Sequence, residues 1–186
     1  MSNFVVTDRV EVELAAIVKA LAVDRVFVLV DENTAECCLS RVDLSEYNPF
    51  VIKIKAGDES KTIDTAVAIW EELVDNGATR SSLLVNLGGG MVTDLGGFVA
   101  ATFKRGMKFV NVPTTLLGVV DAATGGKTGV NFRGLKNEIG VFAKAERVLV
   151  DTRFFETLDF KNRLSGYAEM VKHALIADPI LLEQTL

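Results

Sequence analysis

The chain has 186 residues, of which 49% are apolar and 24% charged, and its formal net charge is −5. This composition is too apolar for intrinsic disorder and predicts a well-filled core. The acidic balance argues against a nucleic-acid partner, because such proteins usually carry a basic excess. The apolar runs are too short to cross a membrane, so no membrane association is expected.

Two features indicate the cellular compartment. The two cysteines, Cys37 and Cys38, are adjacent and poorly arranged for a structural disulfide, which suits a reducing compartment. The N-terminus has early acidic residues and no apolar segment typical of a secretory signal. We therefore expect a cytoplasmic protein.

Short apolar runs alternate with stretches of helical spacing along the chain. Strands are expected at 26–30, 50–54, 83–87, 109–112 and 146–150, and helices at 10–22, 33–39, 61–76 and 91–102. In the helix at 61–76, the spacing of Ile63, Val67, Trp70 and Val74 predicts one buried stripe. The alternation predicts a Rossmann-like, doubly wound, mostly parallel α/β sheet whose ligands bind at the carboxyl ends of its strands.

The pattern changes after residue 157. Residues 159–176 read as one long helix, and Pro179 suits the first turn of another. We therefore expect an α/β domain over residues 1–157, with residues 158–186 as the first helices of a truncated, all-helical C-terminal domain.

A glycine-rich turn follows the predicted strand at 83–87. Gly88, Gly90 and Thr93 occupy the three glycine positions of a dinucleotide-binding fingerprint, with the last glycine replaced. Such a turn lets the backbone approach a phosphate at a helix N-terminus, although a tight turn without a ligand would also need glycine. Asp94 could cap this helix or hydrogen-bond a ribose or substrate hydroxyl. Glycines 96 and 97 within the helix indicate close packing.

The next segment carries several polar side chains. Thr114 and Thr115 follow a strand and could either donate to a nucleotide or cap a helix. Gly-Gly-Lys-Thr at 125–128 lacks the first glycine and the preceding strand of a Walker phosphate loop, which we exclude. We expect instead a flexible loop that either binds a polyanionic, hydroxyl-rich small molecule or is merely solvated. Its polar residues are Asp121, Lys127, Asn131 and Arg133, followed by Lys136 and Asn137.

Three polar residues share one face of the helix at 159–176. Glu169, Lys172 and His173 are spaced i, i+3 and i+4. Glu169 and His173 could ligate a metal, but spacing alone favours an exposed Glu–Lys pair with a neighbouring histidine.

Taken in order, four segments resemble the 3-dehydroquinate synthases of the sugar-phosphate cyclase superfamily. They read GGGMVTDLGGFVAATFKRG, NVPTTLLGVVDAATGGKTGVN, LKNEIG and SGYAEMVKHALI. The resemblance is densest over residues 83–176 and extends towards the N-terminus through AGDESKT. It implies conversion of 3-deoxy-D-arabino-heptulosonate 7-phosphate to 3-dehydroquinate and phosphate, in the shikimate pathway to chorismate and the aromatic amino acids.

The resemblance also implies the cofactors. NAD oxidises C5 of the substrate, phosphate is eliminated, the ketone is reduced again and an aldol step closes the ring. A divalent metal, Zn²⁺ or Co²⁺, acts as the Lewis acid. The enzyme is thus a carbon–oxygen lyase with no net redox change.

The resemblance assigns roles residue by residue. For NAD it implies Asp31, Asn33, Gly57, Asp58, Glu59, Lys61, Gly88, Gly89, Gly90, Met91, Val92, Thr93, Asp94, Thr114, Thr115, Lys127, Lys136, Phe154, Phe155, Glu156 and Thr157. For catalysis and substrate binding it implies Arg105, Asp121, Lys127, Lys136, Asn137 and Lys172. Some members supply the equivalent of Arg105 to the neighbouring subunit. Glu169 is the implied metal ligand, and the family does not use the position of His173.

The resemblance further implies a sugar-phosphate substrate, a homodimer, and two metal-binding histidines from a helical domain that this chain lacks, so the chain alone is expected to be inactive. Three other functions remain open. Another cyclase of the superfamily would make a 2-deoxy-scyllo-inosose or valiolone skeleton, and an NAD-dependent polyol dehydrogenase would accumulate NADH. A stand-alone nucleotide-binding or scaffold module would have no activity.

Overall fold

A six-stranded parallel sheet forms the centre of the computed structural model, which describes residues 3–123 and 125–185. The strands are β1 (Phe4–Val6), β2 (Val26–Asp31), β3 (Phe50–Ile54), β4 (Leu83–Gly88), β5 (Lys108–Pro113) and β8 (Arg147–Val150). Their order is β1-β8-β5-β4-β2-β3, and every neighbouring pair is parallel. The order reverses at β2, which has β3 on one side and β4 on the other.

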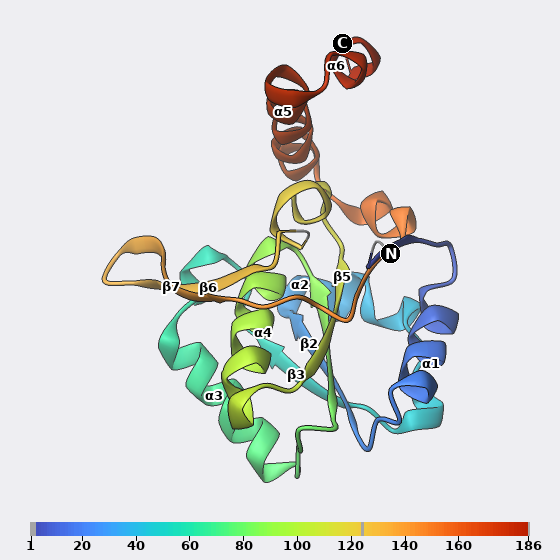
Figure 1. The fold of residues 1–186 in the computed structure, drawn as a ribbon, viewed down its shortest axis with the longest axis vertical. Coiled ribbons are helices and arrows are strands. Elements are labelled where there is room, and N and C mark those ends of the chain that lie inside the picture. The colour runs from blue at the N-terminus through green and yellow to red at the C-terminus, as the bar shows by residue number, and fades with distance from the viewer. Residues whose placement is uncertain (1–2, 124, 186) are drawn as a thin grey trace.

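Helices cover both faces of this sheet (Figure 1). They are α1 (Val10–Ala20), α2 (Glu32–Cys37), α3 (Ile63–Asp75) and α4 (Gly90–Thr102). Two cores result, one with α1 and one with α3 and α4. Alternate residues of β2 serve the two cores, since Val28 packs on the α1 side and Phe27 on the other. Burial on both faces explains why these strands read as continuous apolar runs.

The last two helices, α5 (Phe160–Ala177) and α6 (Pro179–Thr185), extend away from the sheet (Figure 1). Their exposed apolar side chains include Phe160, Ile176 and Ile180. Shorter helical turns lie at Leu39–Arg41, Ser45–Tyr47, Asp58–Ser60, Phe103–Arg105 and Thr152–Thr157, with a π-helical turn at Gly118–Ala122. Within the described ranges, no helix is long and apolar enough to cross a membrane.

The expected flexible loop after residue 118 is wrong. This segment forms the π-helical turn and then an antiparallel hairpin of β6 (Lys127–Phe132) and β7 (Leu135–Phe142). Lys, Asn and Gly are poor strand formers, so the sequence pattern indicated a loop. Tertiary contacts override that preference: α4 packs against β6, and Thr62 bridges to Asn131.

Two further details differ from the sequence predictions. In α3, the buried face is Ala66, Ile69 and Leu73, whereas Val67 and Val74 are exposed. Two apolar stripes one position apart compete on this helix, and spacing alone could not choose between them. The three-residue strand β1, too short to give a periodic signal, was missed.

Candidate functional site

The glycine-rich turn lies at the point where the strand order reverses. Gly88 ends β4 and Gly89 is the N-cap of α4. None of these glycines has a positive φ, so close approach rather than backbone conformation requires them. A Cβ on Gly88 would lie 2.5 Å from Cβ of Val92, and one on Gly90 would lie 3.1 Å from Cβ of Ala122. The turn is thus a narrow backbone cradle at the place where doubly wound sheets bind ligands.

The N-terminus of α4 can bind an anion. The first N–H groups of a helix have no intrahelical partners, and at Gly89 no side chain caps them. Val92 and Thr93 are buried, and Thr93 Oγ1 donates within the turn to the carbonyl of Gly90 at 3.2 Å. The backbone N–H groups of Val92 and Thr93, and not their side chains, are therefore suited to contact a phosphate.

Two segments flank this turn. At the end of β2, Asp31 caps α2 by accepting from Thr34 N–H at 2.8 Å, while Asn33 is exposed. At the end of β5, Thr114 is buried and donates its N–H to Gly88 O at 3.0 Å. The Thr115 hydroxyl accepts from Gly118 N–H at 3.0 Å. The capping alternative therefore holds for Thr115, and Asp31 also caps a helix, which was not predicted from the sequence.

The side chain of Lys61 links its own segment to α4 and β7. Its buried Nζ donates to Asp94 Oδ2 of α4 at 3.0 Å and to Asn137 Oδ1 of β7 at 2.5 Å. Burial raises the pKa of Asp94, and the positive charge of Lys61 offsets this only in part. A buried cation with a partner on each side holds α4 and the hairpin in fixed relation.

Residues 57–61, which we call the nucleotide loop because the resemblance assigns them to NAD, also contact the hairpin. Gly57 has φ of +100°, which favours glycine. Asp58 Oδ2 pairs with Lys136 Nζ at 3.0 Å and accepts from Asn131 Nδ2 at 3.3 Å. Burial acts to raise the pKa of Asp58, but Lys136, Lys61 and Asn131 outweigh it and lower that pKa. Glu59, in the same loop, is exposed.

A pocket of about 500 Å³ lies between α4, the π-helical turn and the hairpin. It brings together four residues expected from the sequence, namely Asp94, Asp121, Lys127 and Asn137. It also includes Glu138 and Thr128, which sequence reasoning missed although they adjoin named residues. Carboxylate, ammonium and amide groups in one pocket suit a ligand rich in hydroxyl and phosphate groups.

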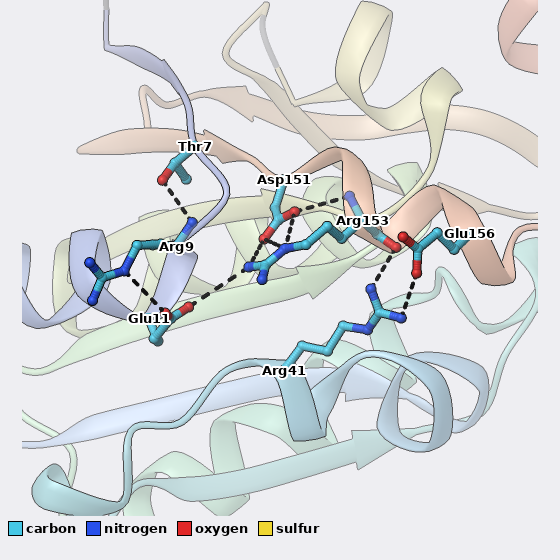
Figure 2. Close-up of polar contacts among 7 residues, drawn as sticks. All are labelled: Thr7, Arg9, Glu11, Arg41, Asp151, Arg153 and Glu156. Atoms are coloured by element: carbon cyan, nitrogen blue, oxygen red, sulfur yellow. Dashed lines mark hydrogen bonds and ion pairs between the residues drawn. The ribbon is translucent and has the colours of Figure 1, made fainter.

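Charged side chains fix the segment after β8, as Figure 2 shows. Arg153 Nε donates to buried Asp151 at 2.9 Å, and Arg41 bonds to Arg153 O at 2.8 Å and Glu156 Oε2 at 2.9 Å. Phe154 is buried in the core on the α1 side, so its side chain is not available to a cofactor. Phe155 is half-buried, and Glu156 and Thr157 are exposed.

The structure brings a possible metal-binding group together around α5. Donor atoms of Asp121, Glu169 and His173 all lie within 4.8 Å of one another, and His173 Nε2 is 3.2 Å from Glu169 Oε1. Lys172 also pairs with Glu169. Gly166 permits this approach, because a Cβ there would lie 2.6 Å from Cβ of Leu116. The cluster joins two distant parts of the sequence beside the pocket.

Arg105 is not part of this pocket. It lies in the turn that precedes β5, near the amino end of that strand, whereas the pocket adjoins the carboxyl ends of the strands. Both Lys104 and Arg105 have positive φ, at 48° and 66°. Within one chain, the guanidinium therefore does not join the other predicted substrate residues.

The fold and the pocket place the chain among doubly wound α/β domains that have a glycine-rich turn where the strand order reverses. Residues 51–165 match the family model described as 3-dehydroquinate synthase N-terminal. The 3-dehydroquinate synthase of Parabacteroides distasonis is 51% identical over 167 residues, covering 89% of this chain and 47% of that protein. The chain belongs to the 3-dehydroquinate synthase family, and it spans about half the length of this curated relative.

Solved structures of other proteins share this fold. The 2-epi-5-epi-valiolone synthase of Streptomyces hygroscopicus, with NAD⁺ and Zn²⁺ bound, has a TM-score of 0.86 at 30% identity. The match covers 96% of this chain and 51% of that one. A 2-deoxy-scyllo-inosose synthase complexed with carbaglucose-6-phosphate, NAD⁺ and Co²⁺ has a TM-score of 0.83 at 25% identity, covering 93% and 49%. The Rossmann-like fold expected from the sequence is therefore confirmed.

Proposed function

We propose that this chain is the dinucleotide-binding part of a 3-dehydroquinate synthase, which converts 3-deoxy-D-arabino-heptulosonate 7-phosphate to 3-dehydroquinate and phosphate. The observation that carries the proposal is the glycine cradle of Gly88–Gly90, which opens beside the pocket holding Lys127 and Asn137. Family membership and the shared fold with NAD-bound cyclases support it. We further propose residues 1–157 as the NAD-binding domain and 158–186 as the start of a helical domain that binds metal and substrate.

The residues present fit the two cofactors. The cradle would hold the diphosphate of NAD on the first-turn N–H groups of α4, where a Cβ would otherwise fill the space. Glu169 would hold a divalent ion, since carboxylate and imidazole donors gather within 4.8 Å there. When bound, NAD supplies a hydride acceptor and donor, and the metal supplies Lewis-acid polarisation of a substrate oxygen.

The chain's own residues would orient and charge-balance the substrate. Lys127 and Asn137 face the pocket and can bind phosphate or hydroxyl groups. Lys61 holds the Asn137 side chain by its Oδ1, which leaves the amide Nδ2 free to donate. The ammonium group of Lys172 pairs with Glu169 in this structure. If Glu169 binds a cation, this ammonium group would become available to bind the substrate.

We propose that Arg105 acts in a homodimer, because its position near the amino end of β5 leaves it outside the pocket of its own chain. The two cysteines are free, which is compatible with a cytoplasmic protein.

The test combines calorimetry with a phosphate-release assay. We expect the chain to bind NAD, and Gly90→Val to weaken binding because its side chain would enter the cradle beside Ala122. Ala68→Val is the control, since that residue is exposed on α3 and does not line the pocket. We expect no phosphate release from the heptulosonate phosphate with this chain, NAD and Zn²⁺, because relatives are about twice as long. Failure of the wild-type chain to bind NAD would contradict the proposal.

A further inference from the structure

Asn131, on β6, lies between the nucleotide loop and the tip of the hairpin. Its side-chain Nδ2 donates to the carbonyl of Asp58 at 3.1 Å and to Asp58 Oδ2 at 3.3 Å. Its Oδ1 accepts from the backbone N–H of Asn137 at 3.0 Å. One amide group therefore bonds to both segments at once.

The backbone reinforces this junction. Asn131 N–H donates to Lys61 O at 2.8 Å, and the adjacent Thr62 forms an isolated parallel bridge with Asn131. Nucleotide loop and hairpin thus share a short strand-like contact centred on one residue. The pairing of β6 with β7 is irregular between Val130 and Phe132, so the backbone of Asn131 can pair with residues 61–62 instead of with β7.

The residues that follow depend on this junction for their conformation. Asn137 has φ of +56°, a left-handed conformation that asparagine adopts more readily than most residues other than glycine. The bond from its N–H to Asn131 helps to hold it there, and its side chain then reaches Lys61. The preceding residue, Lys136, pairs through its Nζ with Asp58 Oδ2 at 3.0 Å. Both tip residues therefore contact the nucleotide loop beside Asn131.

We propose that Asn131 is a positioning residue that fixes the hairpin tip to the nucleotide loop and so couples binding of the dinucleotide to placement of Lys136 and Asn137. The inference rests on the proposed function and on the family resemblance, which assigns residues 57–61 to the cofactor and Lys136 and Asn137 to substrate binding. Asn131 itself need not contact either ligand. An amide is required because the side chain must donate to Asp58 and accept from Asn137 together.

The first experiment measures hydrogen exchange of the ligand-free chain. We expect Asn131→Ala to speed exchange of the amides at 136–138 by about tenfold, because the acceptor for Asn137 N–H is lost. Asn76→Ala is the matched control: that side chain donates to Glu72 O at 2.9 Å, at the end of α3 and away from the pocket. Unchanged exchange at 136–138 in Asn131→Ala would overturn the proposal.

The second experiment measures NAD affinity by calorimetry. We expect Asn131→Ala and Asn131→Asp each to weaken binding by about tenfold, while Asn76→Ala binds as the wild type does. Asn131→Asp places a carboxylate against that of Asp58. The double variant Asp58→Asn with Asn131→Asp restores a donor facing an acceptor, so it should bind more tightly than Asn131→Asp alone. Rescue would show that the contact between side chains 58 and 131, and not merely the loss of asparagine, changes NAD binding.

The outcomes separate the two proposals. If the wild type binds NAD and both Asn131 variants bind equally well, the coupling is wrong while the proposed function stands. If the double variant shows no rescue, the side-chain contact with Asp58 does not carry the coupling, and the inference fails. If the wild type does not bind NAD, the proposed function fails, and the exchange result alone decides whether Asn131 anchors the tip.

Discussion

At the scale of single residues, buried polar side chains decide where backbones can approach. Asn86 is fully buried in β4 and donates to Asn111 Oδ1 of β5 at 2.9 Å. A Cβ on Gly96 would lie 2.0 Å from Asn86 Oδ1. A glycine in the middle of α4 therefore lets the helix pack on a polar side chain of the sheet, as the sequence predicted in general terms.

This contact predicts the effect of Gly96→Ala. The added methyl group must displace Asn86 or move α4, so we expect a loss of about 1–3 kcal/mol in the free energy of unfolding, despite the better helix propensity of alanine. Urea unfolding measures it. Gly125→Ala is the control, with nothing within 4 Å of the new Cβ, and should change stability by less than about 0.5 kcal/mol. Equal stability of the two variants would contradict the contact.

Asp151 predicts a pH dependence. Burial acts to raise its pKa, but hydrogen bonds and charge from Arg153 outweigh burial and lower that pKa. A lowered folded-state pKa adds stability that is complete above the unfolded value of about 3.9 and is lost as the pH falls through the folded-state pKa. We expect the stability difference between wild type and Asp151→Asn to shrink on acidification below about pH 4. Urea midpoints from pH 6 to pH 2 measure it, and a constant difference would disprove it.

At the scale of elements, the β6–β7 hairpin closes through two facing glycines. A Cβ on Gly140 would lie 2.2 Å from Thr128 O, and one on Gly129 would lie 2.6 Å from Ile139 O. The two strands can therefore pair only if both positions lack side chains. The hairpin forms one wall of the pocket, so strand pairing and pocket formation depend on the same glycines.

We expect Gly140→Val to open the hairpin while leaving the six-stranded sheet folded. Amides of 127–142 should then exchange rapidly, and those of β2 and β4 should keep their protection, because the core lies elsewhere. Hydrogen exchange by NMR measures both regions. The control is Gly134→Asn at the hairpin turn, where φ is +80° and nothing lies within 4 Å; asparagine tolerates that conformation. Retained protection across 127–142 in Gly140→Val would refute the prediction.

At the scale of the whole molecule, the proposed cofactor site joins parts of the chain that are far apart in sequence. Lys61, Asp94 and Asn137 come from three elements and meet through one ammonium group. A ligand bound across this junction would stabilise the folded chain as a unit, because it binds the folded state alone.

We therefore expect NAD to raise the melting temperature of the chain. At a hundredfold excess over its dissociation constant, NAD should add about 2.7 kcal/mol to the free energy of unfolding. Thermal unfolding with and without NAD measures it, and Gly90→Val should show a smaller shift. An unchanged melting temperature at high NAD would count against the proposed site.

The sequence by itself determined the parallel α/β sheet, the glycine turn after β4 and the helical end of the chain. Those features depend on local signals: apolar runs of strand length, glycines at a strand end, and spacing along a helix. The same signals could not distinguish two overlapping stripes on α3, and they missed the hairpin, whose residues are poor strand formers.

The tertiary structure alone decided which polar residues meet. It grouped Asp121 with Glu169 and His173, and it placed Asn131 between the nucleotide loop and the hairpin tip. It also put Arg105 near the amino end of β5, away from the pocket. It also showed that Phe154 is part of the core. Such contacts depend on the relative placement of elements distant in sequence, which helix and strand periodicity do not encode.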